Sequence, residues 1–414
     1  MAAIALTPRK HLRTGHFLWR DKPFKTDALK TSCRADIAIV GAGISGALMA
    51  EAMSRHTEKV VVLDRRAPGL GSTRASTAML QFEIDTSLTE LSERMGFAGA
   101  ARAWVRAFRA TQALIRLIEE NHIPCGFGRR HALYLAGDEM GARRMAKEAR
   151  ARNRAGLACE LLSGKVLQTR FGIDRAAAIF SGGAAIADPV ALTRALLAKA
   201  RSRGARIFAP AEASRLLASP HGVVLDAGGH FIEARHAIFC TGYELLEGLP
   251  RGKVKITSSW AAATGPGADY PRWLDDTVMW EASTPYLYMR TTPDGRLLVG
   301  GEDAGLDSPA YRADTLDRKA KRLGRVFIDI GRNAYGQTAV PPYAVRARPG
   351  APVAMPLDWS ELDDRRIRGD TFTLRTIPRR LERDGDPWQP GRRGRSLTKP
   401  QRRLDKLRAE EEDR

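Results

Sequence analysis

The sequence is poor in cysteine and contains no long apolar run. Its four cysteines are widely spaced and form no C-x-x-C pair, which argues against a structural zinc site and against a disulfide scaffold. The longest uncharged stretch, residues 37–50, contains three glycines and is shorter than the roughly 18 apolar residues that a membrane helix needs. The apolar start, residues 2–6, is too short for a signal peptide. We therefore expect a cytoplasmic chain with no transmembrane segment and no metal site.

The rest of the composition is that of a globular protein with an excess of positive charge. Of the 414 residues, 43% are hydrophobic and 28% are charged, and the formal net charge is +20. This length predicts two domains, or one large α/β domain with a satellite. Net charge bears on association with other molecules and not on the fold. The excess of positive charge is therefore explained either by a basic, solvated surface or by an anionic partner. No specific nucleic acid is expected as a partner.

Residues 36–63 have the pattern of a β-α-β unit. The apolar runs at 36–40 and 60–63 predict two buried strands. Between them, the apolar residues from 44 to 57 recur at helical spacing. Strands and helices alternate further along the chain, which predicts an α/β protein.

Three glycines and one carboxylate occupy the turns of this unit. Gly41, Gly43 and Gly46 directly follow the first strand and open the helix. This spacing permits a tight turn and close approach of the backbone to a pyrophosphate, while the helix N-terminus offers N–H groups to the phosphates. Asp64 ends the second strand, where its carboxylate can accept hydrogen bonds from ribose hydroxyls. The motif therefore predicts a dinucleotide site.

The neighbouring residues narrow the choice of dinucleotide. Arg65 and Arg66 suggest a 2′-phosphate, but Asp64 would repel that group, so FAD or NAD is favoured over NADP. Residues 71–81 are small and hydroxylated, which suits a loop that wraps a long cofactor. On these motifs the sequence resembles the FAD-dependent oxidoreductases of the D-amino-acid oxidase superfamily, which includes glycine oxidase, sarcosine oxidase and glycerol-3-phosphate dehydrogenase.

The resemblance implies FAD as the cofactor and a fold in which two domains are interleaved. The expected class is α/β, with a Rossmann-like FAD/NAD(P)-binding domain and an α+β substrate domain built on a mixed antiparallel sheet. The expected boundaries are an N-terminal arm at 1–35, the FAD-binding domain at 36–95 and 180–245, and the substrate domain at 96–179 and 246–330. The residues expected to hold FAD are Gly41, Gly43, Ile44, Ser45, Gly46, Asp64, Arg65, Gly71, Ser72, Thr73, Ser76, Thr77, Met79, Ala213, Thr241 and Gly242.

The resemblance also implies hydride transfer from a small-molecule substrate to the flavin. We expect oxidation of a C–H bond next to an amine, in an amino acid or a secondary amine, with a hydroxy acid or a polyol phosphate as the alternative substrate. Oxygen, a quinone or another acceptor would then take the electrons. Tyr286, Tyr288 and Arg290 alternate along one predicted strand and share a face. They are the catalytic candidates, because an arginine can clamp a carboxylate with two hydrogen bonds. The other interpretation of this alternation is a partly exposed strand face with no catalytic role.

The pattern changes after residue 330. Residues 331–414 are rich in proline and arginine and have no sustained apolar period, so little apolar surface offsets the entropy of ordering and disorder is expected. The glycine-rich C-terminal segment that the resemblance implies, which closes the flavin site, is missing. We interpret the change as a frameshift in the gene or a replaced C-terminus, and an inactive, truncated flavoprotein is therefore a further alternative.

Overall fold

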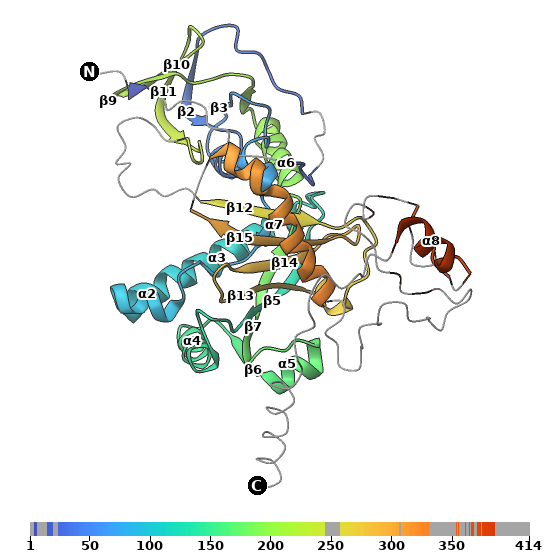
Figure 1. Cartoon of the computed structure of the whole chain (residues 1–414). Helices are drawn as coiled ribbons and strands as arrows, with labels where there is room; N and C mark the ends of the chain where they lie inside the picture. The colour runs from blue at the N-terminus through green and yellow to red at the C-terminus, as the bar shows by residue number, and fades with distance from the viewer. Residues whose placement is uncertain are drawn as a thin grey trace. The chain divides into compact units, whose positions relative to one another are not determined.

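The computed structural model describes residues 4–5, 15–19, 24–244, 257–305 and 308–330, together with parts of 353–385. It divides into two compact units, Met1–Gly336 and Gln337–Arg414. The first unit contains two β-sheets with their helices (Figure 1). Among the described residues, no helix is both long enough and apolar enough to cross a membrane.

The first sheet has seven strands and carries the predicted β-α-β unit. Its strands, in sheet order, are β1 (Ile4–Ala5), β9 (Arg215–Ser219), β10 (Gly222–Ala227), β11 (His230–Phe239), β2 (Cys33–Val40), β3 (Val60–Leu63) and β8 (Arg206–Phe208). The strands from β11 to β8 run parallel, whereas β1, β9, β10 and β11 pair antiparallel. β3 is buried along its whole length, as expected for a parallel strand that is covered on both faces.

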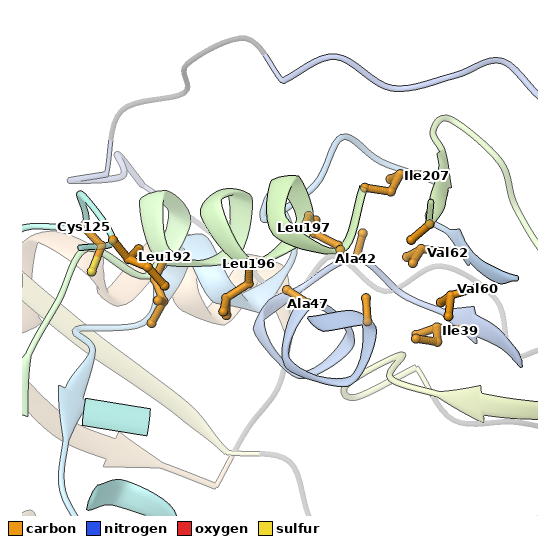
Figure 2. Packing of buried hydrophobic residues seen from close by; sticks show 14 of the residues in the cluster. Ile39, Ala42, Ala47, Val60, Val62, Cys125, Leu192, Leu196, Leu197 and Ile207 are labelled. Carbon is orange, nitrogen blue, oxygen red and sulfur yellow. The ribbon is translucent and has the colours of Figure 1, made fainter. Parts of the chain in front are cut away.

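Helices α1 (Ile44–Met53) and α6 (Pro189–Ser202) pack beside this sheet. Figure 2 shows their side chains meeting those of β2, β3 and β8. Asp188 caps α6, because its side chain accepts hydrogen bonds from the N–H groups of Val190 and Ala191.

The second sheet is mixed and has eight strands. In sheet order they are β12 (Ser258–Ala263), β15 (Leu297–Ala304), β14 (Leu287–Thr291), β13 (Thr277–Glu281), β5 (Gly128–Leu135), β7 (Ala177–Ile186) and β4 (Met79–Leu80), and β6 (Cys159–Ser163) pairs with β7. Its helices are α2 (Leu88–Met95), α3 (Phe97–Glu120), α4 (Ala142–Arg154), α5 (Gly164–Phe171) and α7 (Pro309–Ile330). Helix α7 packs across β12 and β15 (Figure 1).

The two sheets confirm the predicted fold class and most of the predicted elements. Two antiparallel hairpins form, β10 with β11 and β14 with β15. Gly96 separates α2 from α3 and has a φ of 76°, which glycine adopts without the strain of a side chain. The structure adds β6, β7, β12 and β13, which the sequence pattern did not indicate.

The second unit contains helix α8 (Ile377–Asp384). Arg380 is buried and pairs with Glu361 and with Asp384. The prediction of disorder for residues 331–414 otherwise falls largely outside the described residues, as does the proposed loss of the glycine-rich segment.

Candidate functional site

The glycine-rich turn between β2 and α1 leaves no room for side chains. A Cβ on Gly46 would lie 1.8 Å from the carbonyl oxygen of Gly41, and a Cβ on Gly41 would lie 2.4 Å from that of Cys240. Gly41 has a φ of 108°, a conformation open to glycine. Gly43 is the N-cap residue of α1 and has no side chain to cap the helix. The first turn of α1 therefore faces the space in front of the sheet with bare backbone.

Asp64 links the end of β3 to this turn. One carboxylate oxygen accepts the N–H of Ala42 at 2.6 Å, and the other accepts the N–H of Arg66 at 2.7 Å. Burial raises the pKa of Asp64, and these two N–H groups oppose the rise. Since an ionised carboxylate has about four acceptor positions, Asp64 keeps acceptor capacity after both bonds.

A cavity of about 360 Å³ opens between the turn, β3 and the end of β11. Most of the residues predicted to hold FAD line it: Gly41, Gly43, Ile44, Ser45, Asp64, Arg65, Gly71, Ser72, Thr73, Ser76, Ala213, Thr241 and Gly242. Of the other three, Gly46 lies behind the turn, against Gly41. Thr77 and Met79 line a different cavity. We call the first cavity the turn cavity.

The hydroxylated segment after β3 contacts the glycine turn directly. Ser72–Ala75 form a 3₁₀ helix, η1. The hydroxyl of Thr73 accepts the N–H of Ile44 at 2.9 Å, so this loop ties down the first residue of α1. The sequence placed this loop at the cofactor but did not indicate the contact.

The two arginines after Asp64 are paired with acids. Arg65 and Arg66 both form ion pairs with Glu244, and Arg65 Nη1 lies 3.4 Å from Glu212 Oε1. Glu212 and Glu244 also line the turn cavity. The sequence did not single out Glu244. Because carboxylates accompany these arginines, the end of the cavity is not a simple cationic site for a 2′-phosphate.

A second cavity, of about 590 Å³, adjoins the turn cavity through Ser76, which lines both. Thr77 and Met79 line it, and so do Tyr286 and Tyr288. The Tyr288 ring covers Gly300, where an added Cβ would lie 2.3 Å from the hydroxyl oxygen. Burial raises the pKa of Tyr288, while hydrogen bonds to Thr77 and Ser259 oppose that rise. The structure therefore brings two of the catalytic candidates beside two of the cofactor candidates.

Arg290 lies apart from both cavities. Its side chain is 1% exposed, and Nη2 donates to the carbonyl oxygen of Ala187 at 3.0 Å. The guanidinium lies 5.1 Å from the centre of the Trp19 ring, and Trp19 Nε1 donates to the carbonyl oxygen of Ser76 at 2.7 Å. Burial lowers the pKa of Arg290, and the neighbouring Arg130 adds to this effect. Through Trp19, Arg290 supports the wall where the cavities meet.

The second cavity has an acidic wall that the sequence did not indicate. Two arginines line it, Arg144 and Arg152. Its carboxylates are Glu83, Asp85, Glu90, Glu139, Glu281 and Asp303. Arg94 and Arg175, which do not line the cavity, pair with Glu90 and Glu281. Even with these two, six carboxylates face four guanidinium groups, so the cavity is locally negative in a chain of net charge +20. We call it the acidic cavity.

Comparisons with known proteins identify the fold. The model of the family described as FAD dependent oxidoreductase matches residues 36–361. Glycine oxidase from Geobacillus kaustophilus is 20% identical, with a TM-score of 0.56 over 72% of this chain and 80% of that one. L-proline dehydrogenase from P. horikoshii is 16% identical, with a TM-score of 0.56 over 72% of this chain and 79% of that one. At such identities the structural likeness concerns the fold.

Two curated relatives match parts of the chain. A putative Rieske 2Fe-2S iron-sulfur protein, YhfW of Bacillus subtilis, is 22% identical over 60% of this chain and 48% of its own length. The multifunctional non-homologous end joining protein LigD of Pseudomonas aeruginosa is 41% identical over 16% of this chain and 8% of its own length. The chain thus spans about half of the first relative and less than a tenth of the second.

Proposed function

Because this chain belongs to the family of FAD-dependent oxidoreductases, we propose that it oxidises a C–H bond next to an amine, in an amino acid or a secondary amine. Its cofactor is FAD, as the family description states. When bound, FAD supplies the hydride acceptor, and the protein supplies binding, orientation and electrostatics. The substrate class is our inference from the residues beside the cofactor cavity.

The residues of the turn cavity fit the adenosine diphosphate part of FAD. The bare backbone at Gly41 and Gly43 suits a pyrophosphate at the start of α1. Asp64 has acceptor capacity left for ribose hydroxyls. Ser72 and Thr73 offer hydroxyl groups in the same cavity. We propose that these residues hold the cofactor, with Thr77 and Met79 meeting the remainder of it in the acidic cavity.

One observation carries the choice of an amine: the acidic cavity begins where the turn cavity ends, at Ser76. A cavity with more carboxylates than guanidinium groups attracts cations and repels anions. A protonated amine or amino acid offers a positively charged ammonium group, whereas a hydroxy acid or a polyol phosphate carries negative charge only. The charge of the wall therefore favours an amine.

Tyr286 and Tyr288 are proposed to close the substrate end of this cavity. Their rings lie 5.6 Å apart, centre to centre. Burial, the strongest effect, raises the pKa of Tyr286, and the nearby Asp303 adds to it, so this phenol is neutral at pH 7. For Arg290, the predicted clamp on a carboxylate stays a prediction. Its contacts with Trp19 and Ala187 support a positioning role instead.

The experiment is spectroscopic. The purified chain is denatured to identify the released cofactor, and the folded chain is mixed anaerobically with amino acids, secondary amines, hydroxy acids and polyol phosphates. We expect FAD, and bleaching of its visible absorbance by amines. Bleaching by hydroxy acids or polyol phosphates alone would reject the amine assignment. Adding oxygen or a quinone to the bleached protein then identifies the acceptor, which we propose to be one of these or another electron carrier.

A further inference from the structure

Three buried polar atoms in the wall of the acidic cavity have no hydrogen-bond partner. They are Glu83 Oε2, Gln81 Oε1 and Arg152 Nη1, and all three residues line the cavity. A buried polar atom without a partner is costly, and native proteins have few of them. Two of the three are acceptors, so this part of the wall is suited to a ligand that donates hydrogen bonds.

Glu83 is held in one position by its neighbours. The hydroxyl of Ser181, on β7, donates to Glu83 Oε1 at 3.0 Å. Arg152 Nη1, on α4, lies 3.7 Å from the same oxygen. The Glu83 side chain is only 3% exposed. Oε1 therefore has one hydrogen bond and one ion-pair contact, whereas Oε2 has no hydrogen-bond partner.

In their ionised forms, the groups around Glu83 do not balance in charge, and burial raises the pKa of Glu83 although Arg152 opposes the rise. Arg152 Nε donates to Glu148 Oε1 at 2.9 Å, and both side chains are buried. The guanidinium also lies over the ring of Trp104, 4.6 Å from its centre. Glu83, Glu148 and Arg152 thus form a buried cluster of two carboxylates and one guanidinium. One further positive charge would make the cluster neutral.

We propose that Glu83 Oε2 binds the ammonium group of the amine substrate, with Gln81 Oε1 as a second acceptor. The inference rests on the proposed function and names the residue that selects the substrate class. An ammonium group donates up to three hydrogen bonds and supplies the missing positive charge. Arg152 and Ser181 are positioning residues, because they fix the carboxylate without occupying Oε2.

The test uses a probe that binds without reacting. tert-Butylammonium has no hydrogen on the carbon next to nitrogen, so it cannot be oxidised there, and tert-butanol is its uncharged analogue. Dissociation constants of both are measured by calorimetry on the FAD-loaded full chain. We expect the cation to bind at least about tenfold more tightly than the alcohol, because a hydrogen bond to a charged group is stronger than one between neutral groups. Equal binding of the two probes by the unmodified protein would overturn the proposal.

Two variants test whether Glu83 causes the preference for the cation over the alcohol. E83Q keeps the size of the side chain and removes its charge, and we expect it to abolish the preference for the cation. E51Q is the control, because Glu51 is also buried and paired with arginines, Arg55 and Arg203, yet lines neither cavity. A merely structural role for Glu83 would weaken both probes alike and leave their ratio unchanged, which would overturn the proposal.

A third variant covers the case in which E83Q does not fold. E83D keeps the charge but withdraws the carboxylate by one methylene group, so the preference for the cation should shrink by several-fold; an unchanged preference would count against Glu83. These binding measurements can succeed or fail independently of the proposed reaction. If the cation binds through Glu83 but no amine bleaches the flavin, the binding site stands and the proposed reaction fails.

Discussion

Replacing Asp64 with alanine tests the assignment of the turn cavity to FAD. Asp64 accepts the N–H groups of Ala42 and Arg66, and it is proposed to bind the ribose as well. A hydrogen bond to a charged group contributes about 1.5–3 kcal/mol. Losing two of them therefore costs about 3–6 kcal/mol in the organisation of the turn. Losing one more to the ribose raises the dissociation constant of FAD about 10- to 150-fold.

The assay is a titration of the cofactor-free protein with FAD, followed by fluorescence. The control is D36A, because Asp36 lies at the start of the same β-α-β unit, accepts the hydroxyl of Thr57 at 2.6 Å and lines neither cavity. We expect D36A to bind FAD as the unmodified chain does. A D64A protein that is folded and binds FAD within about threefold of the unmodified chain would refute the reasoning, since even one such bond is worth about tenfold.

Other predictions concern the glycine turn and the buried charges. G46A should lose bound FAD, because its Cβ would lie 1.8 Å from the Gly41 oxygen. The control G141A should retain FAD, because no atom lies within 4 Å of the added Cβ. The ratio of FAD absorbance to protein absorbance measures the retained cofactor, and equal ratios for the two variants would contradict the prediction. E148Q should lower the free energy of unfolding in urea by about 3–5 kcal/mol, since it breaks a buried pair with Arg152; a loss below about 1 kcal/mol would contradict this. Burial raises the pKa of Glu148, but Arg152 and the Thr89 N–H outweigh it and hold the pKa below its usual 4.5. The ionised carboxylate therefore stabilises the fold above about pH 4.5, and this contribution to the free energy of unfolding is lost as the pH falls. Urea midpoints measured between pH 3 and 7 should fall toward low pH in the unmodified chain and fall less in E148Q.

Local patterns were enough to predict the cofactor half of the molecule. The strands β2 and β3 and the helix α1 follow from short apolar runs and glycine spacing. Most residues that line the turn cavity lie within residues 40–76, and the others come from residues 211–213 and 240–244. Family, fold class and cofactor are confirmed by the family model and the structure. The division of the chain into cofactor and substrate domains stays a prediction.

The acidic wall was beyond the reach of local patterns. Glu83, Glu148 and Ser181 come from distant parts of the chain and meet only in the folded protein. Arg152 lies in the charged helix α4, whose composition suggests a solvated helix, yet the side chain is 2% exposed. Strand β7 was missed for a different reason. It contains Gly182 and Gly183, which interrupt the apolar pattern, and Gly183 has a φ of 91°.

The central claim is that this FAD-dependent oxidoreductase acts on amines. The most direct measurement is an anaerobic titration of the FAD-loaded chain with its most effective amine and with the hydroxyl analogue of the same carbon skeleton. We predict that the amine bleaches the visible absorbance of the flavin stoichiometrically and that the hydroxyl analogue leaves it unchanged. Bleaching by the hydroxyl compound, with none by the amine, would contradict the account.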